Sequence, residues 1–216
     1  EKVGQLMSDQ NSVNPDSFLK MADLAESKGD PARGETVYRR PELGCVACHA
    51  IGGVGGRVGP DLTSIGASAP TDYLVESLIA PNAKIKEGYH SVILETNDGE
   101  EYSGILQSEN GDEYFLRNAV NQIVSVAKQD VSEKNMGASM MPAGLLEALG
   151  DQDKHDLLSF LSKLGESGPF DAARNNVARR WKLRAGRHTD EQFGIERIIG
   201  DTSGSAWNPA DTLVDG

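Results

Sequence analysis

The pentapeptide Cys45-Val46-Ala47-Cys48-His49 carries the most specific chemical signal in this chain. Two thiols separated by two residues can form thioether bonds to the vinyl groups of a haem. A histidine directly after the second thiol can then bind the iron as an axial ligand. The chain has 216 residues and two cysteines, both of which lie in this segment. The spacing therefore predicts one covalently attached haem c.

Three other interpretations of the two cysteines are a structural disulfide, a thioredoxin-like redox pair and half of a zinc site. A zinc site needs further Cys or His ligands at short spacing, and the sequence has no second CxxC and no HxxxH. A redox CxxC is expected at the start of a helix that follows a strand. This one follows a predicted helix and opens a glycine-rich loop, so covalent haem is favoured.

Capping residues and apolar spacing predict four helices around this motif. They cover residues 14–28, 30–39, 72–80 and 151–164, with Asn14, Asp30, Thr71 and Asp151 as their caps. Gly34 lies inside the second helix, where a glycine costs about 1 kcal/mol relative to alanine. We therefore expect another helix to cross close to Gly34. The last helix carries a stripe of leucines at Leu157, Leu158, Leu161 and Leu164.

A different periodicity begins at Tyr89 and continues to Val131. The β-prone runs in this segment cover residues 91–96, 101–107, 113–118 and 122–127. Asp-Gly and Asn-Gly pairs separate the first three runs, which is a strong hairpin signal. A small antiparallel insertion is predicted at about residues 89–131. It has no cluster of reactive side chains, so we expect a packing or docking module.

Met141, which precedes Pro142, is the predicted second axial ligand. A thioether sulfur opposite a histidine raises the reduction potential of haem iron and favours electron transfer. Pro142 disfavours helix at the residue before it, which would place Met141 on a loop. Met140, a histidine or an open site are the alternatives for this ligand, and both methionines could instead be core fillers.

Charge and composition limit the partners. The net charge is -12 and the pI is about 4.8, which argues against nucleic acid and favours a partner with a positively charged docking face. No apolar run has the length of a membrane span. The segment 174–187 holds six basic residues and no acidic one, and it predicts an amphipathic helix that folds back onto the acidic body. Covalent haem implies a periplasmic or otherwise extracytoplasmic location, and Glu1-Lys2-Val3-Gly4 is expected to follow a processed or longer precursor.

The order of these features resembles class I cytochromes c: a helix with Gly34 and Tyr38, CxxCH, a Gly-Pro-Asp-Leu loop at 59–62, Met-Pro and a leucine-rich last helix. The chain resembles more narrowly the haem-binding domain of planctomycete and verrucomicrobial proteins, the Pirellula type. It shares the segment over 73–89 and a β insertion before the Met-Pro loop. This resemblance covers about residues 29–164. It implies a mainly α fold, the class I cytochrome c helical fold around one covalent haem, with a small antiparallel β insertion.

The resemblance also implies a set of cofactor contacts. Attachment and axial ligation fall to Cys45, Cys48, His49 and Met141. The carbonyl of Pro60 is implied to accept the second ring N–H of His49, which would fix the ring and raise its basicity. Leu62 is implied to pack on the haem. Arg57, the nearest cation in the loop, is the predicted partner of a haem propionate.

The predicted function is a monohaem c-type cytochrome domain that carries single electrons and is not itself an enzyme. Relatives of this type commonly form the C-terminal part of large periplasmic chains that resemble sugar or alcohol dehydrogenases. The expected electron donor is therefore a periplasmic dehydrogenase, separate or fused, and the electron passes to a downstream acceptor. The alternatives are a haem enzyme or a gas or redox sensor with a labile distal ligand, and a module that uses haem as a structural staple. The predicted divisions are an N-terminal helical segment 1–28, a cytochrome domain 29–165 and a C-terminal extension 166–216.

Overall fold

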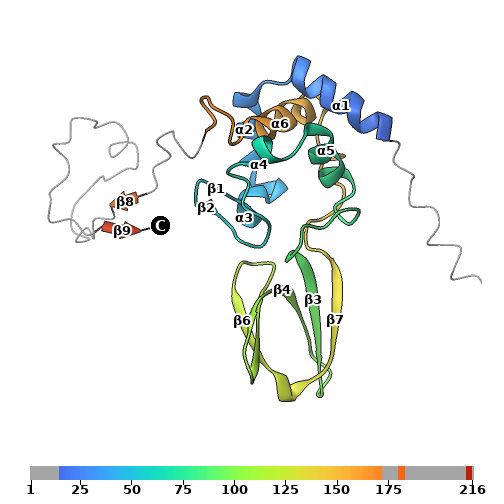
Figure 1. Cartoon of the computed structure of the whole chain (residues 1–216), viewed down its shortest axis with the longest axis vertical. Helices are drawn as coiled ribbons and strands as arrows, with labels where there is room; N and C mark the ends of the chain where they lie inside the picture. The colour runs from blue at the N-terminus through green and yellow to red at the C-terminus, as the bar shows by residue number, and fades with distance from the viewer. Residues whose placement is uncertain (1–14, 172–179, 183–212, 216) are drawn as a thin grey trace, which may run out of the picture. The chain divides into compact units, whose positions relative to one another are not determined.

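The computed structural model describes residues 15–171, 180–182 and 213–215 (Figure 1). The chain divides into two units, residues 1–175 and 176–216. In the second unit, β8 (Arg180–Lys182) pairs with β9 (Leu213–Asp215) in antiparallel fashion. The predicted basic helix over 174–187 is therefore wrong at 180–182, and its other residues lie outside those described. The three-part division of the chain stays a prediction.

The helices of the described first unit fall before and after one antiparallel sheet. They are α1 (Pro15–Lys28), α2 (Pro31–Tyr38), α3 (Cys45–Cys48), α4 (Ile65–Ser68), α5 (Thr71–Ile79) and α6 (Asp151–Lys163), with short 3-10 turns η1 (Pro41–Leu43) and η2 (Lys128–Asp130). Asp30 caps α2 as predicted, because its side chain accepts hydrogen bonds from two backbone N–H groups of the first turn. Thr71 and Asp151 are the first helical residues of α5 and α6, not their caps. The predicted cap Asn14 lies outside the described residues. None of the described helices combines the length and the hydrophobicity that a bilayer crossing requires.

Helices α2 and α6 cross at Gly34, as the sequence predicted. A Cβ built at Gly34 would lie 1.9 Å from the carbonyl oxygen of Asp156 and 2.7 Å from the Cβ of Phe160. Any larger residue would force the two helices apart. All four leucines of the predicted stripe, three on α6 and Leu164 directly after it, are buried in the helical core. Helix α1 contributes Phe18 and Ala25 to the same core.

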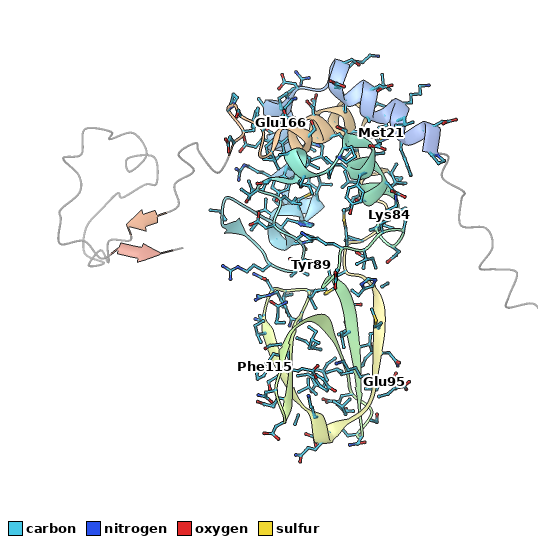
Figure 2. The ribbon with its side chains drawn as sticks, in the orientation of Figure 1. Met21, Lys84, Tyr89, Glu95, Phe115 and Glu166 are labelled. Atoms are coloured by element: carbon cyan, nitrogen blue, oxygen red, sulfur yellow. The ribbon has the colours of Figure 1, made fainter. Side chains whose placement is uncertain are left out.

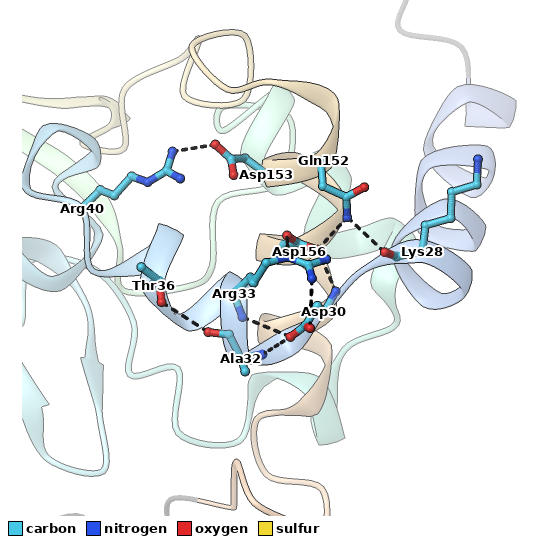
Figure 3. Close-up of polar contacts among 9 residues, drawn as sticks. All are labelled: Lys28, Asp30, Ala32, Arg33, Thr36, Arg40, Gln152, Asp153 and Asp156. Atoms are coloured by element: carbon cyan, nitrogen blue, oxygen red, sulfur yellow. Dashed lines mark hydrogen bonds and ion pairs between the residues drawn. The ribbon is translucent and has the colours of Figure 1, made fainter.

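A buried carboxylate fastens this crossing (Figure 3). The Asp156 side chain, 1% exposed, accepts hydrogen bonds from Arg33 Nε at 2.7 Å and from the Asp30 N–H at 2.7 Å. It also accepts one from Gln152 Nε2 at 2.8 Å. Burial by itself would raise the pKa of Asp156, but these hydrogen bonds and the Arg33 charge hold it below its ordinary value. The carboxylate thus links α6 to the start of α2.

The sheet has five antiparallel strands in the order β6-β5-β4-β3-β7. They are β3 (His90–Thr96), β4 (Glu101–Glu109), β5 (Glu113–Arg117), β6 (Ile123–Ala127) and β7 (Val131–Ser139). A separate two-residue hairpin joins β1 (Ala50–Ile51) and β2 (Val54–Gly55). Strand β4 pairs with β3 through its first half and with β5 through its second half, and the sheet curves around a core of its own (Figure 1). That core contains Val92, Leu94, Leu116 and Val126.

The four predicted strands are present, but the prediction missed β7. Its segment, Val-Ser-Glu-Lys-Asn-Met-Gly-Ala-Ser, has one β-branched apolar residue and no alternation, so local propensity gave no signal. Pairing with β3 makes it a strand. The sheet therefore extends to Ser139, beyond the predicted end near Val131.

The expected mainly α fold of class I cytochromes c is wrong for this chain. The described residues form a mixed α and β structure, with a five-stranded antiparallel sheet beside six helices. The physical reason is that the sheet buries its own apolar residues in a second core, separate from the helical one. It is a full packing unit and not a small addition to a helical body.

Candidate functional site

The CxxCH segment forms a single helical turn. Gly44 precedes it in a left-handed conformation, φ 67°, which a residue with a side chain adopts at a cost. Cys45 and Cys48 stand three residues apart on this turn, so their side chains share one face. The turn closes with the His49 N–H donating to the Cys45 carbonyl at 2.8 Å. Both thiols are free and half-buried.

The glycine-rich loop that follows is hydrogen-bonded back onto this turn. The N–H groups of Gly56, Gly59 and Leu62 donate to carbonyls of residues 46, 48 and 50 at 2.9, 2.7 and 2.8 Å. The loop backbone lies directly against the histidine ring, because a Cβ built at Gly59 would be 2.3 Å from His49 Cε1. Only glycine leaves room for the imidazole in this position.

The imidazole of His49 is oriented by one short contact. Its Nδ1 lies 2.7 Å from the Pro60 carbonyl oxygen, which is the contact that the resemblance implied. A carbonyl oxygen only accepts, so Nδ1 carries the proton and Nε2 keeps its lone pair. Burial lowers the pKa of His49, against the opposing effect of the Pro60 hydrogen bond. The result is a neutral imidazole with one nitrogen available as a ligand.

The pKa values of the two thiols are shifted in the opposite direction from those of a reactive redox pair. Burial raises the pKa of Cys45 to about 11 and also raises the pKa of Cys48. A reactive thioredoxin-like CxxC needs a depressed pKa to supply a thiolate at neutral pH. The environment of this CxxC therefore argues against that alternative.

A large apolar pocket opens beside the motif. Its free space is about 1270 Å³. This value exceeds the roughly 300–1,000 Å³ of typical ligand sites because it includes space that is open to solvent. Cys45, Cys48 and His49 line it together with Met140 and Met141 from far along the chain. The rest of the lining is mostly apolar, and α5, α6 and the loop after the motif each contribute aliphatic side chains to it. These residues fit a planar apolar group whose metal accepts an imidazole nitrogen and a thioether sulfur as ligands.

The two methionines of the pocket differ in their packing. Met141 packs against the helical core, whereas Met140 is not among the residues that do so. The backbone N–H of Met141 also donates to Ser139 Oγ at 3.1 Å. These contacts favour Met141 as the better-fixed thioether.

The remaining predicted site residues behave unequally. Pro60 and Leu62 line the pocket, and Leu62 packs against the helical core. Arg57 is exposed and is not part of the lining; its backbone N–H donates to Asn121 Oδ1 at 3.1 Å, at the turn between β5 and β6. The structure therefore offers no contact that supports Arg57 as a propionate partner.

The charged residues that line the pocket are Lys84 and Lys86. Lys84 is paired with Glu76 at 2.6 Å, and Lys86 lies 6.0 Å from the ring centre of Tyr89. Figure 2 labels Lys84 and Tyr89, with Tyr89 at the junction between helices and sheet. The prediction missed both lysines, although they lie in the 73–89 segment on which the resemblance rests. Among the described residues that line the pocket there is no carboxylate.

The other histidines lie outside the pocket or outside the described residues. His90 begins β3 and His155 is in α6, and neither lines the pocket. His188 is not described. Within the described ranges, no group of three or more His, Cys, Asp or Glu side chains is placed to hold a metal ion.

Comparison with known proteins adds no relative: no protein-family model matches the chain, and no curated protein matches it.

Proposed function

We propose that this chain is a monohaem c-type cytochrome domain that carries single electrons and catalyses no reaction of its own. One observation carries the proposal. A single apolar pocket combines a CxxCH turn, a histidine with Nδ1 tied to a carbonyl, and a methionine from a distant part of the chain. This is the donor set of a histidine–methionine haem site.

Each of these residues has a defined task. The free thiols of Cys45 and Cys48 lie on the pocket side of one helical turn and can both form thioethers to the same group. Nε2 of His49 would supply a nitrogen ligand to the iron, while the bond from Nδ1–H to Pro60 keeps the ring plane fixed and the nitrogen basic. Met141 would supply a thioether sulfur as a second ligand. When bound, the haem provides a one-electron couple between ferric and ferrous iron.

The lining of the pocket favours electron transfer over catalysis. Apolar side chains dominate the described lining, and beyond His49 it holds no histidine, aspartate or glutamate, so tyrosines and lysines are, besides the two thiols, its other proton-carrying side chains of the acid–base type. Ligation by Met141 would keep peroxide or a diatomic gas from binding to the iron. A gas sensor or haem enzyme with a labile distal ligand is the second candidate, and it requires Met141 to dissociate.

The cell location and the partner belong to the same proposal. Covalent attachment through CxxCH points to an extracytoplasmic, periplasmic protein. The donor is a dehydrogenase domain, separate or in the same polypeptide, with a positively charged docking face opposite the net charge of -12. Both charged residues of the pocket lining are lysines, so the acidic docking surface has to lie outside the pocket.

The test uses the full chain produced in a periplasm with haem-attachment machinery. The pyridine haemochrome spectrum should show one haem with two thioether bonds, and Cys48→Ala should reduce this to one bond or to none. The oxidised protein should show the long-wavelength charge-transfer band of methionine-ligated haem. Absence of covalent haem would overturn the proposal. Stoichiometric carbon monoxide binding to the ferrous protein would replace it with the sensor or enzyme alternative.

A further inference from the structure

We propose that the β3–β7 ribbon, residues 90–96 and 131–139, is a positioning element for Met141, with Ser139 as the positioning residue at its end. This inference rests on the proposed function, because it takes Met141 as the distal ligand. It also gives a role at the pocket to a sheet that otherwise packs around a core of its own.

The ribbon leads directly into the distal loop, the segment 140–150 that carries Met141. β7 remains paired with β3 up to its last residue, where Ser139 is opposite His90. Met141 follows two residues later, so it is separated from the last backbone pair of the sheet by Met140 alone. Because only one residue intervenes, a displacement of the ribbon end also displaces Met141.

A register shift lies at this end of the ribbon. Val92 pairs with Met136 and His90 pairs with Ser139, so β7 advances three residues while β3 advances two. β7 thus carries one extra residue just before the pocket. Bulges of this kind bend a strand and change the direction in which the following side chains point, and they are frequent beside functional sites.

The shifted segment is held by a buried side chain of the neighbouring strand. Ser91, which is buried, donates its Oγ hydrogen to the Ala138 carbonyl, with the two oxygens 2.7 Å apart. Gly137 leaves the space for this contact, since a Cβ there would lie 2.2 Å from Ser91 Oγ. The bend is therefore a fixed feature of the ribbon.

Ser139 then ties the ribbon to the helical body. Its N–H donates to Asn82 Oδ1 at 2.8 Å, and its Oγ accepts the N–H of Met141 at 3.1 Å. Asn82 follows Pro81, a pocket-lining residue just after α5. The two bonds join the end of α5, the end of β7 and the backbone of the distal ligand.

The loop of residues 140–150 has no regular structure to hold Met141. It contains no helix or strand, Met141 is only partly buried, and the next buried anchors in the loop are Leu146 and Leu149, five and eight residues further on. A ligand on an irregular loop keeps its geometry when a rigid element supports it. The ribbon is the rigid element that is adjacent in the chain.

The test compares haem-loaded full-chain variants. Ser139→Ala and Asn82→Ala each remove one hydrogen bond, and we expect up to about a fivefold rise in the methionine-dissociated population for each. Carbon monoxide association with the ferrous protein should rise by the same factor, the charge-transfer band should weaken and the potential should fall. Asn82→Asp keeps an acceptor oxygen and should restore the wild-type charge-transfer band and carbon monoxide binding. Covalent haem should be unchanged in all of them.

Matched controls lie at the other end of the same ribbon. Ser132 Oγ donates to the Glu95 carbonyl at 3.0 Å, and Asn97 Nδ2 donates to the Gln129 carbonyl at 3.0 Å. Ser132→Ala and Asn97→Ala should leave the band, the potential and carbon monoxide binding at wild-type values.

Thermal unfolding of every variant separates a local effect from a general loss of stability. The inference is overturned if the wild-type protein shows the charge-transfer band and the Ser139→Ala and Asn82→Ala variants are indistinguishable from it. That result would leave the proposed function intact. A wild-type protein without the band would instead overturn the assignment of Met141.

Discussion

The two sides of the pocket are built in different ways. The side that carries His49, called the proximal side, is local, because its turn, its loop and their hydrogen bonds all lie between Gly44 and Leu62. The distal side is assembled from the end of α5, from β3 and from the end of β7, which are distant in sequence. A local motif can be recognised from a few residues, whereas an assembled one depends on the packing of the whole domain.

The largest effect should come from the proximal side. Gly59→Val would place side-chain atoms where the His49 ring lies, since even a Cβ would be 2.3 Å from Cε1. We expect loss of covalent haem and about 3 kcal/mol of destabilisation, the upper end of overpacking costs. Haem yield and urea unfolding measure both. Gly150→Ala, at a site where a Cβ meets nothing within 4 Å, is the control. Normal haem incorporation in Gly59→Val would contradict the local construction of this side.

Met141→Ala should remove the ligand on the distal side of the pocket and leave the proximal side unchanged. The proximal contacts do not involve Met141, so covalent haem should be retained. Loss of the thioether ligand should remove the charge-transfer band, lower the potential and allow carbon monoxide to bind at full occupancy. Met136→Ala, a change on β7 at a side chain that is 74% exposed, should alter none of these. If Met140→Ala alone removed the band, the ligand assignment would move to Met140.

Asp156→Asn tests how far the proximal side depends on tertiary support. Helix α2 carries Tyr38, whose hydroxyl donates to the His49 carbonyl at 3.2 Å, and Asp156 holds α2 against α6. We expect a loss of about 1.5 kcal/mol, the scale of a hydrogen bond to a charged group, because Arg33 is 57% exposed and remains solvated. Chemical unfolding at pH 7 measures it. Asp153→Asn, which removes a pair with Arg40 whose carboxylate is 34% exposed, should cost about 0.5 kcal/mol.

The same carboxylate gives a pH dependence with a defined sign. The pKa of Asp156 is lower in the folded chain than its ordinary value. Its contribution to stability is therefore complete above about pH 4 and is lost as the pH falls through the folded pKa. The stability difference between wild type and Asp156→Asn should shrink below about pH 4. A difference that stays constant down to pH 2 would show that the charge of Asp156 plays no part.

The smallest effect concerns the mouth of the pocket. Lys86→Gln removes a lining cation for which the described residues show no ion pair, so it should lower the reduction potential slightly and make it less sensitive to salt. Lys84→Gln should change it less, because Glu76 already compensates the Lys84 charge. Redox titrations at two ionic strengths compare them. Equal shifts in both variants would show that the Glu76 pair is irrelevant.

Sequence reasoning succeeded where the signal was local or strongly periodic. The Asp30 cap, the helix crossing at Gly34 and the leucine stripe of α6 were all predicted correctly. Sequence reasoning failed where contacts with segments distant in the chain determine the local conformation or the pocket lining. β7 has a polar sequence and becomes a strand only through β3. Arg57 is close to the motif in sequence but is outside the pocket lining, while the more distant Lys84 and Lys86 are part of it.

The mainly α expectation failed for a related reason. The sequence showed hairpin signals for the middle of the chain, but it did not show that these strands curve around a core of their own. Whether an inserted segment is a minor addition or a second packing unit depends on which faces become buried. That outcome follows from long-range contacts.

By itself, the sequence determined that two thiols and a histidine share one turn, the local arrangement on which the proposed haem attachment rests. It also determined the helix crossing, because a glycine inside a helix marks a close approach. Only the tertiary structure decided which cations line the pocket and how Met141 is held. The hold on Met141 depends on hydrogen bonds of Asn82 and Ser91 to the end of β7. No periodicity or spacing within one segment encodes a contact between segments that are distant in the chain.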